Sequence, residues 1–208
     1  MEDNKIDWYK NCFVFDEAKN SKKFYTDLTD DDIIYLEAAT RHDWETCDGL
    51  LLKQFYKKMP NTVVKHQVYR RDKKNDIWVY QVHRKHKNDA GWLGEGIYFY
   101  GHEQAAWDAI EYGWWMHGFY INVEHPFIMD EDIHDALVKA NDSKVSERMT
   151  EYLKNHLMDG VLWTGDGREE WCVLKPNQLK RAAVTRDDDG RVIPVSYRFD
   201  LSKDDNRY

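Results

Sequence analysis

The chain has 208 residues, of which 42% are hydrophobic and 14% aromatic, so it can bury one substantial core and is not of the disordered class. Its net charge of −8 argues against a protein that coats nucleic acid without selectivity. No apolar run approaches the ~20 residues of a membrane span. The start, Met-Glu-Asp-Asn-Lys, lacks the basic and then apolar pattern of a signal peptide, so we expect a cytoplasmic protein with no membrane partner.

Residues 1–60 are predicted to form an acidic, helical N-terminal extension. Thr29 is placed as an N-cap, and the three aspartates after it suit a first helical turn, where the helix dipole favours negative charge. A second helix is expected over 44–59, ending before Pro60. The segment carries no catalytic pattern, so we interpret it as an extension that packs on the core or recognises a partner.

Two strands, 63–71 and 76–83, are expected next, joined by a polar turn. Between Lys65 and Lys87 lie eight cations against only two acidic residues. A solvated hairpin explains this charge about as well as a basic rim for a phosphate-bearing ligand does. His83 falls at the end of the second strand, where a histidine is by default a partly exposed polar residue.

A glycine-rich loop and an aromatic strand stand near the centre of the chain. Gly94 and Gly96 flank one charged residue, and Ile97-Tyr-Phe-Tyr100 follows as a short strand before a helix over 102–112. Glycines allow a backbone or a flat ligand to approach closely, and a row of rings offers a stacking surface. A buried hairpin strand explains the same residues equally well, so this pattern alone assigns no function.

The second half of the chain alternates strands with amphipathic helices. The expected elements are a strand over 117–123, helices with core-facing stripes at 133–140 and 145–157, strands at 161–163 and 170–175, and a hairpin of 182–186 with 192–199. Strands paired in hairpins, with helices grouped between them, indicate an α+β fold. The cysteines are odd in number and fit no metal-type spacing, so we expect packed thiols and no metal site; they are Cys12, Cys47 and Cys172.

Glu170 opens an otherwise apolar strand, in which alternation places it on the same face as Cys172 and Leu174. A carboxylate on the inner face of a sheet is costly unless it is paired, hydrogen-bonded or at a cleft. A strand-end glutamate that faces water and is bridged to Arg168 is the plain alternative. Spacing alone does not separate the two interpretations.

These residues resemble a family, the ADP-ribosyltransferases, and within it the branch of diphtheria toxin and the poly(ADP-ribose) polymerases with its His-Tyr-Glu triad. Gly94-Glu-Gly-Ile-Tyr-Phe99 is similar to that branch's Gly-Lys-Gly-Ile-Tyr-Phe loop and strand. Glu170-Trp-Cys-Val-Leu174 resembles its Glu-Tyr-Ile-Val-Tyr strand, which also leads to a glutamine, here Gln178. The stretch over 176–199 is similar to phage- and bacterium-encoded members.

The resemblance covers 63–199 and implies an ADP-ribosyltransferase-like split β-sandwich with flanking helices. The catalytic domain would span 61–200, after the extension of 1–60 and before a tail of 201–208. NAD would be the substrate, and no metal is implied.

Residue by residue, the resemblance implies roles in NAD chemistry. Tyr98 would stack on the nicotinamide ring, while Glu170 would bind a ribose hydroxyl and stabilise the sugar cation that forms as nicotinamide leaves. His83 would take the first triad place and hold the adenosine-side ribose. The other residues implied to contact NAD are Arg84, Gly94, Gly96, Phe99 and, as alternatives for a second stacking ring, Trp107 and Tyr112.

The sequence departs from the family pattern at His83, because Arg84 and a lysine follow it where the family has Gly and then Ser or Thr. Arg84 is the alternative first residue, as in the sister Arg-Ser-Glu branch, although Tyr98-Phe-Tyr100 holds none of that branch's Ser or Thr. Arg168 stands two positions before Glu170, where arginine-modifying members have Glu and Asn- or Cys-modifying members have Gln. Arg168 and Gln178 are the acceptor-side candidates.

We therefore expect a mono-ADP-ribosyltransferase of bacterial or phage type, a toxin or effector that modifies a macromolecule. A protein acceptor is favoured because the chain is acidic, and the basic stretch keeps RNA or DNA open as the alternative. A degraded triad would instead leave a module that binds NAD or a partner, and an NAD hydrolase lies between. Residues 1–60 are the expected contact for an antitoxin or a host target.

Overall fold

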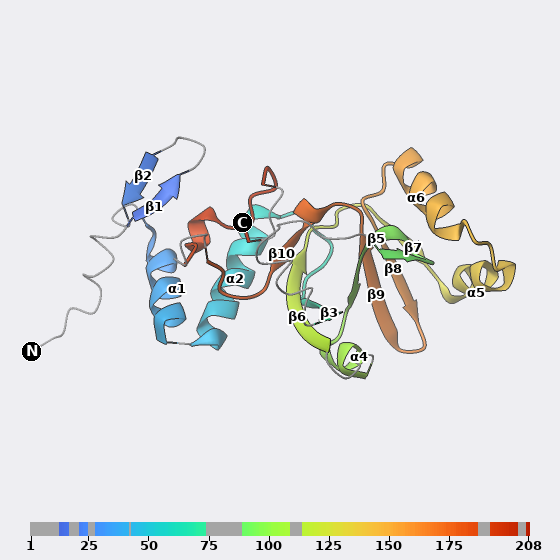
Figure 1. Cartoon of the computed structure of the whole chain (residues 1–208), viewed down its shortest axis with the longest axis horizontal. Helices are drawn as coiled ribbons and strands as arrows, with labels where there is room; N and C mark the ends of the chain where they lie inside the picture. Colours follow the sequence, from blue (N-terminus) through green and yellow to red (C-terminus); the bar gives the residue numbers. More distant parts are fainter. Residues whose placement is uncertain are drawn as a thin grey trace, which may run out of the picture.

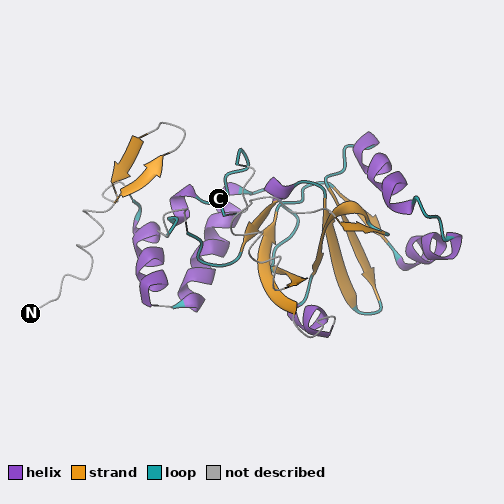
Figure 2. Cartoon of the chain, in the orientation of Figure 1, coloured by secondary structure: helices purple, strands orange, loops and turns teal. Residues whose placement is uncertain are grey.

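The computed structural model of the chain describes residues 13–16, 21–24, 28–41, 43–73, 89–108, 114–186, 192–203 and 207–208. A mixed sheet lies between helices at the two ends of the molecule (Figure 1), as the colouring by element type in Figure 2 also shows. The predicted α+β class is confirmed. Within these ranges no helix combines the length and the apolar character that a membrane crossing needs.

The N-terminal region begins with a hairpin and continues into two helices. β1 (Phe13–Asp16) pairs antiparallel with β2 (Ser21–Phe24), so the prediction of a wholly helical extension is wrong here. The run Phe-Val-Phe favours an extended backbone, because aromatic and β-branched residues fit a pleated strand. α1 (Asp30–Arg41) and α2 (Trp44–Lys58) confirm the two predicted helices.

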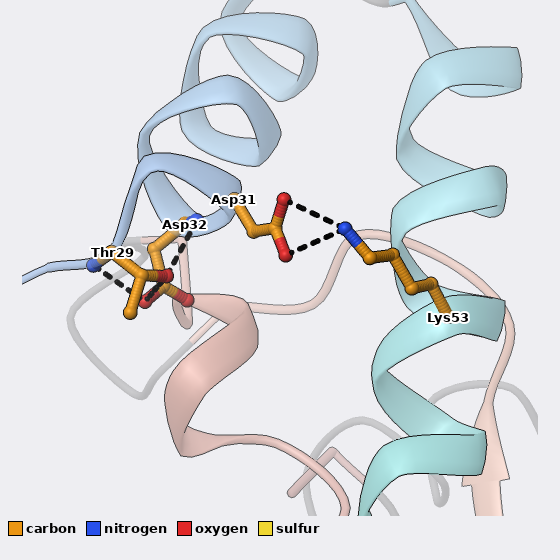
Figure 3. Close-up of polar contacts among 4 residues, drawn as sticks. All are labelled: Thr29, Asp31, Asp32 and Lys53. Carbon is orange, nitrogen blue, oxygen red and sulfur yellow. Dashed lines mark hydrogen bonds and ion pairs between the residues drawn. The ribbon is translucent and has the colours of Figure 1, made fainter.

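Reciprocal hydrogen bonds fix the start of α1 (Figure 3). The backbone N–H of Thr29 donates to the Asp32 carboxylate at 3.1 Å, and the N–H of Asp32 donates to the Thr29 hydroxyl at 3.2 Å. This arrangement satisfies donors that a helix start leaves without partners. Lys53 of α2 contacts both carboxylate oxygens of Asp31, at 3.1 and 3.2 Å, and so links the two helices.

The sheet runs in the order β10, β6, β3, β5, β9, β8, β7, with β4 paired to β5 off this path. Its strands are β3 (Val68–Lys73), β4 (Asp89–Gly91), β5 (Gly94–Tyr100), β6 (Trp114–Ile121), β7 (Pro126–Met129), β8 (Gly160–Gly165), β9 (Arg168–Val173) and β10 (Leu179–Arg181). All pairs are antiparallel except β7 with β8. That parallel pair needs a long crossover, which α5 (Glu131–Ala140) and α6 (Val145–Asn155) supply.

The chain after β9 differs from the predicted final hairpin. The segments 182–186 and 192–199 share one isolated bridge, between Arg186 and Val192. Pro194 has no backbone N–H to give to a ladder, and it leads into the 3-10 turn Val195–Tyr197. The strand that does form is β10, which pairs with β6 and lies before the predicted hairpin.

The two faces of the sheet carry different clusters. The core face holds Ile97 and Phe99 of β5 with Trp171 and Val173 of β9, in one cluster with residues of β6 and β10. The other, which we call the helix-covered face, meets α1 and α2 at its β6 end and α5 and α6 at its β8 end. Cys47, within α2, and Cys172, beneath α6, are both buried, as predicted for packed thiols, whereas Cys12 lies outside the described residues.

His117 of β6 lies on the core face beside Arg181 of β10, whose guanidinium contacts its Nδ1 at 3.2 Å. Burial, and secondly the positive charge of Arg181, lower the pKa of His117 to about 4 from its ordinary 6.5. Between these two values the unfolded chain binds a proton that the folded chain does not. The free energy of unfolding must therefore fall as the pH drops through this window.

We expect His117→Gln to remove that loss. Between pH 6.5 and about 4, the wild-type chain should lose about 2 kcal/mol more of its unfolding free energy than the variant, a figure lowered for partial solvent access. Urea unfolding of both proteins across this pH range measures the difference between their unfolding free energies. Contributions from other titrating groups are the same in both proteins and cancel in this difference. Parallel pH profiles for the two proteins would contradict the assignment.

Candidate functional site

The predicted pair Tyr98 and Glu170 lies on neighbouring strands and on one face. β5 and β9 are antiparallel, with Tyr98 opposite Cys172 and Tyr100 opposite Glu170. Because side chains alternate between faces, Tyr98, Tyr100 and Glu170 all point to the helix-covered face. Tyr98 and Glu170 are diagonal neighbours, a relation in which side chains lie roughly 7–8 Å apart.

These residues belong to a half-exposed central strip of the helix-covered face, formed by Tyr69, Arg71, Tyr98, Tyr100 and Glu170. Beyond the strip on either side the face is closed, since Tyr120 is 2% exposed beneath α2 and Cys172 is 0% exposed beneath α6. Between these two closed regions, the strip keeps partial exposure to solvent.

Arg71 is the functional candidate that the sequence analysis missed. Tyr69 of β3 pairs with Tyr100 of β5, so Arg71, two residues further along, comes to the same face beside Tyr98. Its guanidinium lies 6.0 Å from the centre of the Tyr100 ring. The basic stretch of the sequence contains Arg71, but only the register of β3 against β5 brings it to Tyr98 and Glu170.

Glu170 is held in a partly dry and positively charged setting. Burial raises the pKa of the Glu170 carboxyl, and the positive charges of Arg168, then His134, then Arg71 oppose that rise. A carboxylate with cations on several sides can stay ionised although it is half-buried. Arg168 lies exposed at the start of β9, and its acceptor-side role stays a prediction.

The wall beyond Glu170 is aromatic. Trp163 of β8 stands directly opposite Glu170 and is 8% exposed. The imidazole of His134, from α5, lies over the Trp163 indole with ring centres 4.8 Å apart. The indole N–H of Trp163 is buried and finds no hydrogen-bond acceptor within the described part of the chain.

The glycine loop fixes the Tyr98 ring. The Tyr98 hydroxyl donates to the backbone oxygen of Gly94 at 2.7 Å, and the ring lies where a side chain at Gly91 would stand, 2.6 Å from the hydroxyl. Gly94 has a φ of +109°, which side chains resist. At Gly96 a Cβ would come within 2.5 Å of the Cys172 sulfur, so strand packing explains this glycine.

Of two further predicted site residues, one is buried and the other is exposed. Phe99 follows Tyr98 and points to the core face, where it is 2% exposed and meets Phe119 at 5.3 Å between ring centres. It is a core residue, which corrects its assignment to NAD contact. Trp107, in α4 (Glu103–Asp108), is 51% exposed and its indole donates to Glu103 at 3.3 Å. His83, Arg84 and Tyr112 lie outside the described residues.

Gln178 is a structural residue, which corrects its placement on the acceptor side. Its side-chain oxygen accepts from the N–H groups of Leu174 and Lys175, at 3.1 and 2.9 Å. Its amide donates to the backbone oxygens of Asn122 and Asp159, at 3.0 and 2.7 Å. The side chain is buried and joins three segments that are distant in the sequence.

We expect Gln178→Met to lower the free energy of unfolding by about 2 kcal/mol, because methionine matches the size of glutamine but leaves buried backbone groups without partners. The neighbouring Asn177→Ala, at an exposed position with one contact to the Leu201 oxygen, should change it by less than about 1 kcal/mol. Urea unfolding compares the two. Equal stability of both variants would show that this network is not important for the fold.

Glu169, next to Glu170, serves the other face. Its carboxylate lies 2.9 Å from His66 Nε2 and accepts a hydrogen bond from the Trp171 indole. The hydrogen bond with His66 lowers the pKa of Glu169, and the same bond raises the pKa of His66. The two adjacent carboxylates thus lie on opposite faces of the sheet. Glu169 is paired and structural, whereas Glu170 belongs to the strip.

A separate open hollow of about 560 Å³ is found at the start of β7, and none of its lining residues belongs to the central strip. Among the described residues no cluster of histidine, cysteine and acidic side chains is suited to a metal ion. No known family model, no curated protein and no solved structure matches this chain.

Proposed function

We propose that the chain is a mono-ADP-ribosyltransferase that moves ADP-ribose from NAD to a macromolecular acceptor, with a protein favoured. One observation carries the proposal. Tyr98 and Glu170 lie on the same face of adjacent strands, in the half-exposed strip that also contains Arg71. The motifs that resemble the family thereby lie close together in space. A structural hairpin would not need an ionisable carboxylate at that place.

The proposed fold, a split β-sandwich of the ADP-ribosyltransferase type, is supported by the core face. Trp171 and Val173 of β9 belong to one buried cluster with Ile121 of β6 and Leu179 of β10, although other strands separate them in the sheet order. A sheet that folds toward its own core face brings such residues together. The opposite face is the one that carries the strip.

In the proposed reaction, the bond between the nicotinamide nitrogen and ribose C1′ breaks, and its electron pair leaves with neutral nicotinamide. Glu170 would stabilise the positive charge that develops on the sugar, and the Tyr98 ring would orient the leaving group. An acceptor nucleophile then bonds to C1′ and loses its proton to solvent. Arg71, placed beside Tyr98, would hold the diphosphate or the adjoining ribose.

The direct test is incubation of the purified protein with NAD labelled in its adenylate part, together with a cell lysate. Labelled macromolecules that resist nuclease and are lost with protease are expected. Nuclease-sensitive label would identify RNA or DNA as the acceptor. Release of nicotinamide without labelled macromolecules would identify an NAD hydrolase, and binding of NAD without nicotinamide release would overturn the enzyme assignment.

A further inference from the structure

The proposed reaction uses only one end of the strip, and the other end contains an unexplained carboxylate. Asp48 of α2 is half-buried, and no described residue gives its carboxylate a hydrogen bond or an ion pair. Its backbone oxygen accepts from the Tyr120 hydroxyl at 3.2 Å, which fixes this turn of α2 over β6. Burial raises the pKa of the Asp48 carboxyl, so hydrogen-bond donors from a bound ligand would stabilise its ionised form.

Asp48 lies near the β3 end of the strip. Burial raises the pKa of the Tyr69 hydroxyl, and the negative charges of Glu103 and then Asp48 add to the rise. Tyr69 stands opposite Gly118 of β6, and Tyr120 is two residues further on the same face. Asp48 thus approaches the half-exposed ring of Tyr69 from the side that α2 covers.

The direction of a bound dinucleotide follows from which side is closed. Past Glu170 the face is filled by Trp163 and, under α6, by Val161, which is 0% exposed. A nucleotide whose nicotinamide end lies at Tyr98 and Glu170 would therefore extend away from that side, across β5 and β3 to the wall that α2 forms over β6. From β9 to β6 this is three strand spacings, about 14 Å, with Arg71 of β3 two spacings along and Asp48 at the far end.

We propose that α2 forms the adenosine-side wall of the nucleotide site, with Asp48 accepting hydrogen bonds from a ribose diol and the Tyr69 ring supporting the base. This inference rests on the proposed function and extends it to a residue outside the family-like motifs. A carboxylate offers two acceptor oxygens to two neighbouring hydroxyls, which is a geometry that a diol matches. The N-terminal region would then contribute residues to the substrate site, in addition to packing on the core.

The test measures binding of ADP-ribose and, separately, of nicotinamide by calorimetry to the wild-type chain, Asp48→Asn and Glu45→Gln. Glu45 is an exposed carboxylate on the same helix and is the matched control. We expect Asp48→Asn to bind ADP-ribose about tenfold or more weakly, with nicotinamide binding unchanged, while Glu45→Gln behaves as wild type. Tyr69→Leu should weaken ADP-ribose binding in the same way.

Thermal melting separates a binding role from a structural one. Asp48→Asn removes an unpaired charge and should melt at the same or a higher temperature, whereas a residue that holds the fold would melt lower when replaced. Unchanged ADP-ribose affinity, or a lowered melting temperature together with weaker binding, overturns the inference. In either case transfer of label from NAD to macromolecules by the wild-type chain would show that the proposed function still stands. No binding of ADP-ribose or NAD by that chain would remove both.

Discussion

Glu170→Gln will lower the rate of nicotinamide release and ADP-ribose transfer by about 10²–10³-fold, which is the cost of removing a group aimed at charge that develops in a transition state. Glutamine keeps the size of glutamate and one acceptor oxygen, but it offers no negative charge to a sugar cation. The loss should appear in kcat rather than in KM, since the interaction strengthens only as the C–N bond breaks. A timed nicotinamide assay at saturating NAD measures it.

The stability of this variant should stay the same or rise. Burial raises the pKa of Glu170 above its ordinary 4.5, so the ionised side chain opposes folding at every pH above that value. A neutral glutamine avoids this penalty. For the same reason the wild-type rate should fall, as the medium is acidified, at a higher pH than an ordinary glutamate would require.

Glu169→Gln is the matched control on the same strand. It breaks the contact with His66 at 2.9 Å and alters the bond to Trp171, so it should lower the melting temperature. Below that temperature its transfer rate should stay within a few-fold of wild type, because its side chain is on the core face. An equal loss of rate in both variants would sink the assignment of Glu170, and so would a Glu170→Gln protein that works normally.

The sequence could predict the site only as far as local patterns reach. Alternation within 170–174 placed Glu170 with Cys172 correctly, and the same rule separates Tyr98 from Phe99, since adjacent strand residues point to opposite faces. Which neighbour each strand has is not local. Arg71 therefore became visible only when β3 was paired with β5, and the burial of Gln178 only when Asn122 and Asp159 were brought to it.

The helices were predictable for a related reason. α1 and α2 begin at capping residues and α2 ends just before Pro60, while α5 and α6 have apolar stripes at helical spacing. The final segment lacks such signals, because its place depends on distant partners. Arg198 holds this segment in place, but the sequence alone would place an arginine at the surface.

Arg198→Met is expected to lower the free energy of unfolding by about 3 kcal/mol. Arg198 is 0% exposed, and its guanidinium donates to the backbone oxygens of Arg181 and Ala183 at 2.7 and 2.5 Å and to the Tyr35 hydroxyl at 3.2 Å. Methionine fills the space of the stem and avoids burying a charge. It also leaves three acceptors buried without donors, each costing roughly 1–3 kcal/mol, and the second effect is the larger one.

Arg198→Lys and Arg148→Met make this prediction specific. A lysine keeps the charge, but it has no planar fork for two carbonyls and a phenol, so Arg198→Lys should be nearly as unstable as Arg198→Met. Arg148 is 71% exposed and lies 2.7 Å from Asp142. Its replacement by methionine should lower the free energy of unfolding by at most about 1 kcal/mol. Urea unfolding ranks the three variants.

The Arg198→Met variant also links the fold to the site. Arg198 joins α1, through Tyr35, to the segment after β10, and Phe199 packs against Phe55 of α2 at 5.4 Å between ring centres. If α2 is a wall of the nucleotide site, loosening this anchor should weaken ADP-ribose binding while the protein is still folded, and nicotinamide binding should be spared. Arg198→Met with wild-type stability, or with both ligands weakened equally, would show that the anchor and the wall are not coupled in this way.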